Sequence, residues 1–310
     1  MTAFGRGKST MAAGIILGLM AATLQALSYL FSARFGLRHQ ASPVTLLVLM
    51  HVWIGIVALL SLPFLWHPQI LASTDWLLPL GVMTLSYLIA QLSLFQSLRH
   101  AESSRVSPLL GLKILVLILL GSSWQGEHYS LLQWGAAGLC ALGGVWLSRC
   151  GGSIPWQASG WIALACVGYA LSDLSVVYLV RAFDQLPLLQ AAGLSVALSY
   201  LLCGLGCLLF WPRLRQRRLL LQSTPVALSW LLAMICLFSC FALLGAVFGG
   251  IVQSGRGLIS ILLGLLVVRL GWSAGERAPA FAVLVQRMLA AGLMLLAIVL
   301  FALGGNPGPA

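Results

Sequence analysis

The chain has 310 residues, of which 60% are hydrophobic and only 7% are charged, and its formal net charge is +11. Soluble domains carry about 25% charged residues, so this composition excludes a water-soluble fold and predicts an integral membrane protein. The positive charge does not indicate nucleic-acid binding, because the basic residues are scattered between apolar runs and form no stripe with aromatic residues.

Ten apolar runs along the chain are long enough to cross a bilayer, for which a helix needs about 20 residues. The first run begins at Met11. It is about 23 residues long and exceeds the apolar core of a cleaved signal peptide, so we expect it to be retained. The expected spans lie near residues 11–33, 44–66, 76–98, 106–124, 129–148, 158–181, 187–211, 226–248, 254–272 and 280–303.

The motifs of soluble and ATP-driven enzymes are missing from the sequence. We find no HExxH, GxSxG, P-loop or GxGxxG pattern, so the chain is not expected to be an enzyme or an ATP-driven pump. The seven cysteines include no CxxC pair, and they are interpreted as small packing residues rather than as a metal or redox site. No cofactor and no metal are therefore expected.

Two pairs of segments suggest that the chain repeats itself. The segment "ALSYLFSAR" at 26–34 resembles "DLSVVYLVR" at 173–181, and "WQGEHYSLLQWGAAGL" resembles "WSAGERAPAFAVLVQRMLAAGL". This divides the chain into a first five-helix repeat, 1–152, and a second, 153–310. Since five is odd, the second copy is inverted relative to the first, which is typical of secondary transporters with a site near the bilayer midplane. We predict an all-α integral membrane fold of ten transmembrane helices as two inverted five-helix repeats.

The fourth and ninth runs also carry a family resemblance. They read "AESSRVSPLLGLKILVLILLGSSWQGE" and "VQSGRGLISILLGLLVVRLGWSAGE", each with a polar start, an apolar span and a Gly-Glu end. With ten spans in two halves, the chain resembles the EamA-type branch of the drug/metabolite transporter superfamily. The resemblance implies a metabolite carrier with a central cavity between the halves. It implies export, but no particular solute.

The orientation in the membrane has two conflicting predictors. We name the side of the N-terminus face A and the other side face B. Face A is expected to carry four basic residues: Arg6, Lys8, Arg181 and Arg256. Face B is expected to carry eleven: Arg34, Arg38, Arg99, Arg105, Arg149, Arg213, Arg215, Arg217, Arg218, Arg269 and Arg277. The positive-inside rule puts face B in the cytoplasm, whereas the resemblance implies cytoplasmic termini.

Among the six acidic residues, only Asp173 lies deep inside an expected span. An aspartate at the bilayer centre costs at least about 2.5–3.5 kcal/mol on insertion scales, and ionisable residues in spans commonly mark substrate or proton pathways. Asp173 is therefore either a substrate or proton site or a structural anion, for instance paired with Arg256. Gln190, Gln253 and Arg256 are expected to enter from the same face A.

Lys113 is the deepest base, and a second polar layer is expected around it. Gln25 and His51 fall at its depth, with Tyr29 and Gln91 nearby, by the 1.5 Å helical rise. Lys113 either lines a cavity or extends towards face B, and His51 is either a packing residue or suited to proton coupling. Tyr169, like Tyr29, is either a cavity lining or an ordinary span residue. On the same count Lys113 and Asp173 are about 10 Å apart along the membrane normal, so a direct salt bridge between them is not claimed.

The sequence thus favours a secondary active transporter in the cell (inner) membrane that works by alternating access. Lys113 would meet an anionic group, and Asp173 an ammonium group or a coupling proton. This pairing favours amino acids or related zwitterions as the small-molecule solute. Two alternatives stay open: an exporter of cationic drug-like compounds with Asp173 as its anion, and a non-transporting membrane scaffold or receptor, in which protein partners would occupy both charges.

Overall fold

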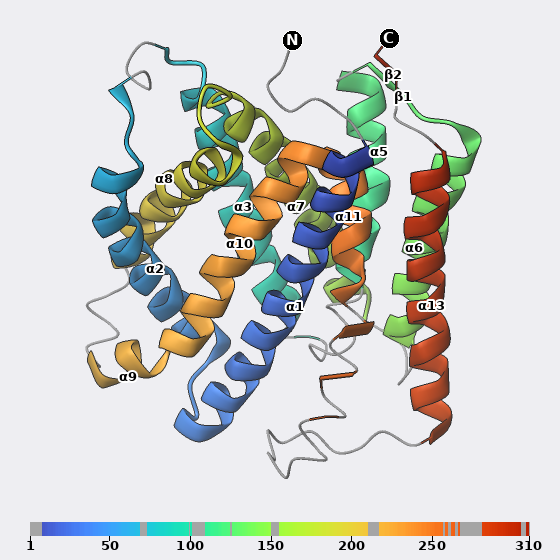
Figure 1. Ribbon diagram of the computed structural model, residues 1–310. Helices are drawn as coiled ribbons and strands as arrows, with labels where there is room; N and C mark the ends of the chain where they lie inside the picture. The colour runs from blue at the N-terminus through green and yellow to red at the C-terminus, as the bar shows by residue number, and fades with distance from the viewer. Residues whose placement is uncertain are drawn as a thin grey trace.

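The computed structural model describes residues 8–68, 73–98, 100, 109–124, 126–149, 155–209, 217–256, 258–259, 262–263, 266, 281–304 and 308–309. Over these residues the regular secondary structure is helical apart from a pair of two-residue strands (Figure 1). In chain order the elements are α1 (Lys8–His39), α2 (Pro43–Leu65), α3 (Leu77–Leu98), the 3-10 turn η2 (Leu110–Leu112), α5 (Lys113–Trp124), β1 (Glu127–His128), α6 (Leu131–Arg149), α7 (Trp156–Arg181), α8 (Leu188–Leu208), α9 (Arg217–Gln222), α10 (Thr224–Leu244), α11 (Ala246–Ser254), α13 (Phe281–Leu303) and β2 (Gly308–Pro309).

Six of these helices, namely α1, α2, α3, α7, α8 and α10, are long and apolar enough to cross a membrane. Three shorter apolar helices cover Leu110–Ser123, Leu131–Trp146 and Met288–Leu303. The predicted all-α membrane fold is therefore confirmed. The count of ten spans is not established, because the expected ninth span at 254–272 lies mostly outside the described residues, as does the expected boundary between the repeats at 152–153.

The expected eighth span, 226–248, ends earlier than predicted. Helix α10 stops at Leu244, and Gly245 follows with φ of 80°. This left-handed conformation is readily adopted only by glycine and turns the chain, so that a new helix, α11, begins at Ala246. The break thus comes about ten residues before the "GRG" sequence at 255–257 that was expected to mark it.

Side chains that bond to the backbone fix where several helices begin. The Ser42 hydroxyl accepts a hydrogen bond from the Thr45 amide, with Pro43 in the first turn of α2. At the start of α6, the Gln133 side chain accepts from the Ser130 amide at 2.9 Å and the Ser130 hydroxyl accepts from the Gln133 amide at 3.3 Å. This reciprocal capping box satisfies amides that the first helical turn leaves unpaired.

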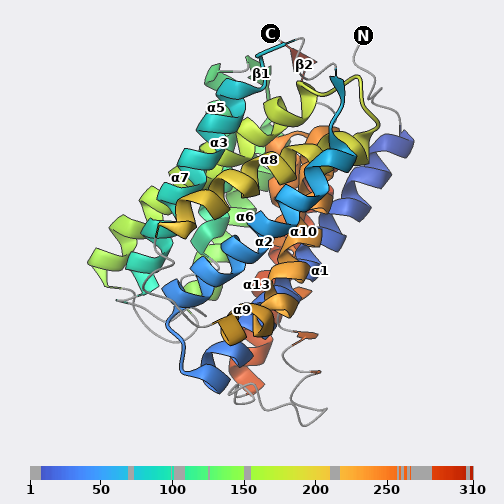
Figure 2. The ribbon, with the colours of Figure 1, turned by 90° about the vertical axis from the view of Figure 1, so that its left-hand side faces the viewer.

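The most extensive helix contacts join α3 with α7, α1 with α10, α2 with α8, and α6 with α13. Each pair combines one helix from either half of the chain. The α6–α13 pair lies at one edge of the bundle, at the right of Figure 1, and β1 pairs there with β2 as an antiparallel ladder. Helix α1 begins and α13 ends on the same side, face A (Figures 1 and 2).

Glycines bring the paired helices close together. A Cβ atom on Gly204 of α8 would lie 2.9 Å from the Cα atom of Gly55 of α2, and one on Gly168 of α7 would lie 2.9 Å from the Ser86 carbonyl of α3. Side chains at these positions would force the helices apart. Lipid chains give no hydrophobic drive for helix association, so close contact of small residues is a main source of stability between such helices.

We expect Gly204→Ala to lower the thermal stability of the detergent-solubilised protein, because overpacking at the α2–α8 crossing typically costs about 1–3 kcal/mol. The matched control is Gly206→Ala on the same helix, where a Cβ atom meets nothing within 4 Å. Melting curves of both variants check this expectation. Equal melting temperatures for the two would contradict the close approach of α2 and α8.

Candidate functional site

The centre of the candidate site is an ion pair between Lys113 and Asp173. The Lys113 ammonium group lies 2.5 Å from an Asp173 carboxylate oxygen, and 12% of each side chain is exposed. Lys113 is the first residue of α5, and Asp173 lies two turns before the end of α7. The pair therefore joins the two halves of the chain, and each charge supplies the compensation that the other needs in a low-dielectric surrounding.

A row of hydrogen bonds continues from this pair across α11 and α1. The Lys113 ammonium also donates to the Gln253 side-chain oxygen at 2.9 Å, and the Gln253 amide donates to Gln25 at 3.1 Å. The Gln25 oxygen accepts a second bond from Arg256 at 3.1 Å, and Arg256 donates to the Tyr29 hydroxyl at 3.2 Å. We call these six residues, from Asp173 to Tyr29, the polar row.

The turn at Gly245 explains how Gln253 and Arg256 reach the polar row. Because α11 begins at Ala246, Arg256 lies ten residues farther along the chain, about 15 Å inside the layer at 1.5 Å per residue. The prediction that Arg256 belongs to face A is therefore wrong. Helix α11 contacts α1, α5 and α7, and α5 also contacts α7.

The sequence did not predict the contact between Lys113 and Asp173. Residue counting measures depth along a helix, whereas a tilted helix advances less along the membrane normal. The long lysine side chain closes the remaining gap. The two polar layers that were expected at opposite depths are thus one row, which takes Lys113 and Gln25 from the first half of the chain and Asp173, Gln253 and Arg256 from the second.

His51 and Gln91 do not join Lys113; they bond instead to Tyr87. The Nε2 atom of His51 lies 3.0 Å from the Tyr87 hydroxyl and its Nδ1 atom 2.8 Å from the Leu47 carbonyl, while the Gln91 amide donates to Tyr87 at 2.9 Å. A carbonyl only accepts, so Nδ1 carries a proton and donates to Leu47. Both ring nitrogens of His51 thus have partners within the protein. This arrangement favours the packing interpretation of His51 over proton coupling.

Aromatic rings link the His51 group to the polar row. Tyr200 stacks on His51 with centroids 5.8 Å apart, and its hydroxyl accepts from the Trp230 indole at 2.8 Å. Trp230 in turn meets Tyr29 edge to face at 6.0 Å. Tyr169 lies against Tyr87 at 6.3 Å. The expected site residues Tyr29 and Tyr169 are thus both part of this aromatic group, which lies beside the charged pair.

The sequence-based site prediction missed Tyr200 and Trp230. It also missed Gln253 as a partner of Lys113. Gln253 was placed beside Asp173, but the link to Lys113 depends on the early turn at Gly245. Tyr200 and Trp230 look like ordinary span residues in the sequence. The one sequence signal for them is a polar group, the Tyr hydroxyl or the Trp indole N–H, inside an apolar run. Such a group usually has a hydrogen-bond partner when it is buried. Gln190 lies elsewhere, where its amide donates to the Leu65 carbonyl at 3.5 Å.

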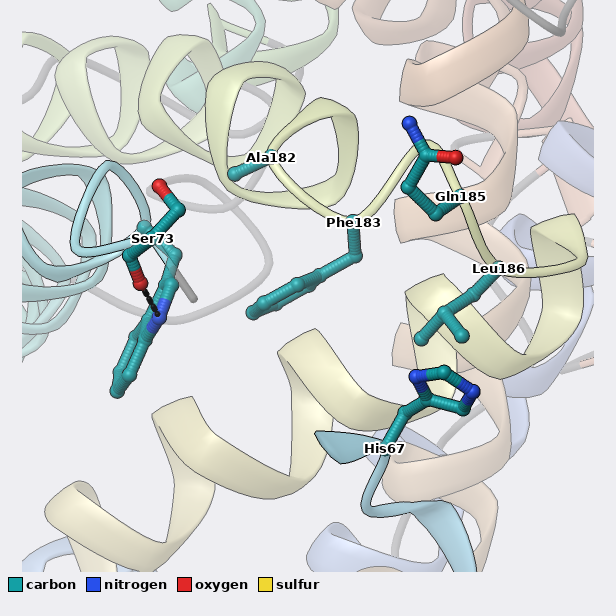
Figure 3. A pocket seen from close by; sticks show the side chains of 7 residues that line it. His67, Ser73, Ala182, Phe183, Gln185 and Leu186 are labelled. Atoms are coloured by element: carbon teal, nitrogen blue, oxygen red, sulfur yellow. Dashed lines mark hydrogen bonds between the residues drawn. The ribbon is translucent and has the colours of Figure 1, made fainter. Parts of the chain in front are cut away.

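A small pocket lies on face A, between the α2–α3 and α7–α8 connections (Figure 3). The Trp76 indole donates to the Ser73 carbonyl at 3.0 Å on one side of it, and Phe183 lies 6.2 Å from the Trp76 ring. The residues that line it are His67, Ser73, Trp76, Ala182, Phe183, Gln185 and Leu186. None of the predicted site residues contributes to this pocket.

A comparison with protein families decides the class of the protein. Residues 12–149 match the model of the EamA-like transporter family. This region belongs to the EamA-like transporter family. The resemblance predicted from the sequence is thereby confirmed, and the EamA-like region contains α1 to α6, including Gln25, Tyr29 and Lys113 of the polar row. With its six span-length helices the chain is a multi-pass membrane protein. Its residues 12–149 are of the EamA-like type, a family of transporters.

A comparison with solved structures extends the likeness to nearly the whole chain. A crystal structure whose description names no function aligns with 94% of this chain and 97% of its own, with a TM-score of 0.62 and 19% sequence identity. At this identity the likeness shows the fold alone. No curated protein sequence matches the chain.

Removing one charge of the central pair is expected to destabilise the protein more than removing both. Lys113→Met or Asp173→Leu alone leaves an uncompensated buried charge, which typically costs about 3–5 kcal/mol of unfolding free energy. The double variant replaces the pair with apolar side chains and should recover most of that loss. Thermal unfolding in detergent measures the stability of the wild type, the two single variants and the double variant. Additive losses would show that the two charges do not act as a pair.

Proposed function

We propose that the protein is a secondary active transporter of small zwitterionic metabolites, with amino acids as the leading class. The single observation that carries this proposal is the Lys113–Asp173 pair at 2.5 Å. The family match supplies the transport class. The ion pair supports the solute class, because a zwitterion offers a carboxylate for Lys113 and an ammonium group for Asp173.

Solute binding would replace the bond between Lys113 and Asp173 with bonds from each residue to the solute. In the present structure each charge of the pair neutralises the other. When a carboxylate draws Lys113 away, Asp173 needs a new positive partner, since an unpaired carboxylate is costly in a membrane interior. The ammonium group of the same solute provides it, and a proton provides it after the solute leaves. This exchange makes a proton the candidate coupling ion and Asp173 its carrier.

Alternating access between two inverted repeats is the proposed mode of movement, and the helix contacts support it. In the expected correspondence, α1, α2, α3 and α6 match α7, α8, α10 and α13. Exchanging the halves then maps the α3–α7 contact onto α1–α10, and maps α2–α8 and α6–α13 each onto itself. A pseudo-two-fold axis predicts such a closed set of contacts. Export as the direction rests on the family resemblance.

The polar row argues against a cationic drug as the preferred solute. Within the described residues the row holds two bases, Lys113 and Arg256, and one acid, Asp173. A cation entering this site would meet a net positive charge. The scaffold alternative predicts that both charges are occupied by protein groups, as they are here, and that no solute moves; a transport experiment separates it from the proposal.

We expect proteoliposomes with the wild-type protein to take up neutral amino acids along an imposed proton gradient. Asp173→Asn and Lys113→Met should each lower this uptake by roughly 10–100-fold, because each loses a charge-assisted bond to the solute. The control is Asp184→Asn, which removes an acid in the α7–α8 connection, outside the polar row. Uptake in Asp173→Asn that matches wild type and still follows pH would refute the proposed role of Asp173, and no uptake of any zwitterion by the wild type would refute the function.

A further inference from the structure

Arg256 carries a charge that the central pair does not balance. Lys113 and Asp173 neutralise each other. Arg256 bonds only to neutral groups among the described residues, the Gln25 amide oxygen and the Tyr29 hydroxyl. The polar row is therefore one positive charge in excess in the absence of a solute.

The guanidinium group of Arg256 has donors left for a ligand. Both of its hydrogen bonds within the described part of the chain start from one nitrogen, Nη1. A guanidinium group has five N–H donors in a planar fork that fits a carboxylate with two parallel bonds. The fork is held in place by the Tyr29 ring, whose centroid lies 5.1 Å from the guanidinium carbon. Among the described residues, the donors on Nε and Nη2 of this fork therefore have no hydrogen-bond partner and can bind a ligand.

Arg256 also lies beside space rather than in closed packing. Its side chain is half-buried, and Tyr29 beneath it is 38% exposed. A guanidinium group that faced lipid at this depth would cost several kcal/mol, on the order of 2.5–3.5 on insertion scales. We therefore expect the exposed part of this pair to face water rather than lipid, at the Gln25 end of the polar row.

We propose that Arg256, supported by Tyr29 and Gln25, binds a second anionic group of the solute, so that the preferred solute class is amino acids with an acidic side chain. The inference rests on the proposed function. Lys113 meets the α-carboxylate, Asp173 the ammonium group and Arg256 the side-chain carboxylate. The two bases and the one acid of the occupied site then each meet an opposite charge of the solute, and the excess positive charge is gone.

The test compares glutamate with its neutral isostere glutamine in proteoliposomes. The wild-type protein is expected to take up glutamate in preference to glutamine, and Arg256→Gln to lower the glutamate-to-glutamine uptake ratio by roughly 10–100-fold, the value of a hydrogen-bonded charge. Arg256→Lys should recover part of the ratio. Arg149→Gln, which removes an exposed base at the end of α6, should leave the ratio as in wild type.

A binding measurement gives a second readout that does not depend on transport. Glutamate should raise the melting temperature of the purified wild-type protein more than glutamine does, and Arg256→Gln should remove that difference. Uptake of glutamine equal to or above that of glutamate in the wild type would overturn the role of Arg256 while the proposed function stands. Failure of the wild type to transport or bind either compound would instead count against the proposed function itself.

Discussion

The need to compensate charge inside a membrane governs the arrangement of the core. Lys113 and Asp173 come from opposite halves of the chain and meet at 2.5 Å. Neither charge is stable alone in a low-dielectric layer, so the pair holds α5 and α7 together. The glutamines extend this compensation: Gln253 accepts from Lys113, and Gln25 accepts from both Gln253 and Arg256. In the proposed function, the residues that stabilise the interior are also the ones that bind the charged solute.

Buried polar groups away from the charges are satisfied just as fully. His51, Tyr87 and Gln91 share a directional set of bonds, and Trp230 donates to Tyr200. Such a network fixes side-chain positions, because a rotated ring would leave a partner without its bond. The aromatic group therefore provides a rigid wall next to the polar row. A rigid wall lets differences in solute shape become differences in affinity.

The sequence predicted the class of the fold and named as site candidates five of the six residues of the polar row, but it did not predict their connections. Hydropathy locates helices because backbone groups in lipid must be bonded within the helix, so the spans at 44–66, 158–181 and 187–211 could be read directly. Asp173 and Lys113 stood out because charges are rare in such runs. Their contact could not be predicted, since it depends on helix tilt. The position of Arg256 depended on one backbone angle, at Gly245, and glycine occurs too often in spans for that turn to be singled out.

The ladder between β1 and β2 restricts how the molecule can move. It ties the connection before α6 to the chain that follows α13, and Gly304 lies so close to Ser130 and Gln133 that a Cβ atom there would come within 2.6 Å of the Gln133 side chain. The β1–β2 ladder lies on face A, and α6 and α13 also pack against each other. If the β1–β2 ladder stays paired throughout a conformational cycle, α6 and α13 remain a rigid pair. The other helices then rotate relative to this pair.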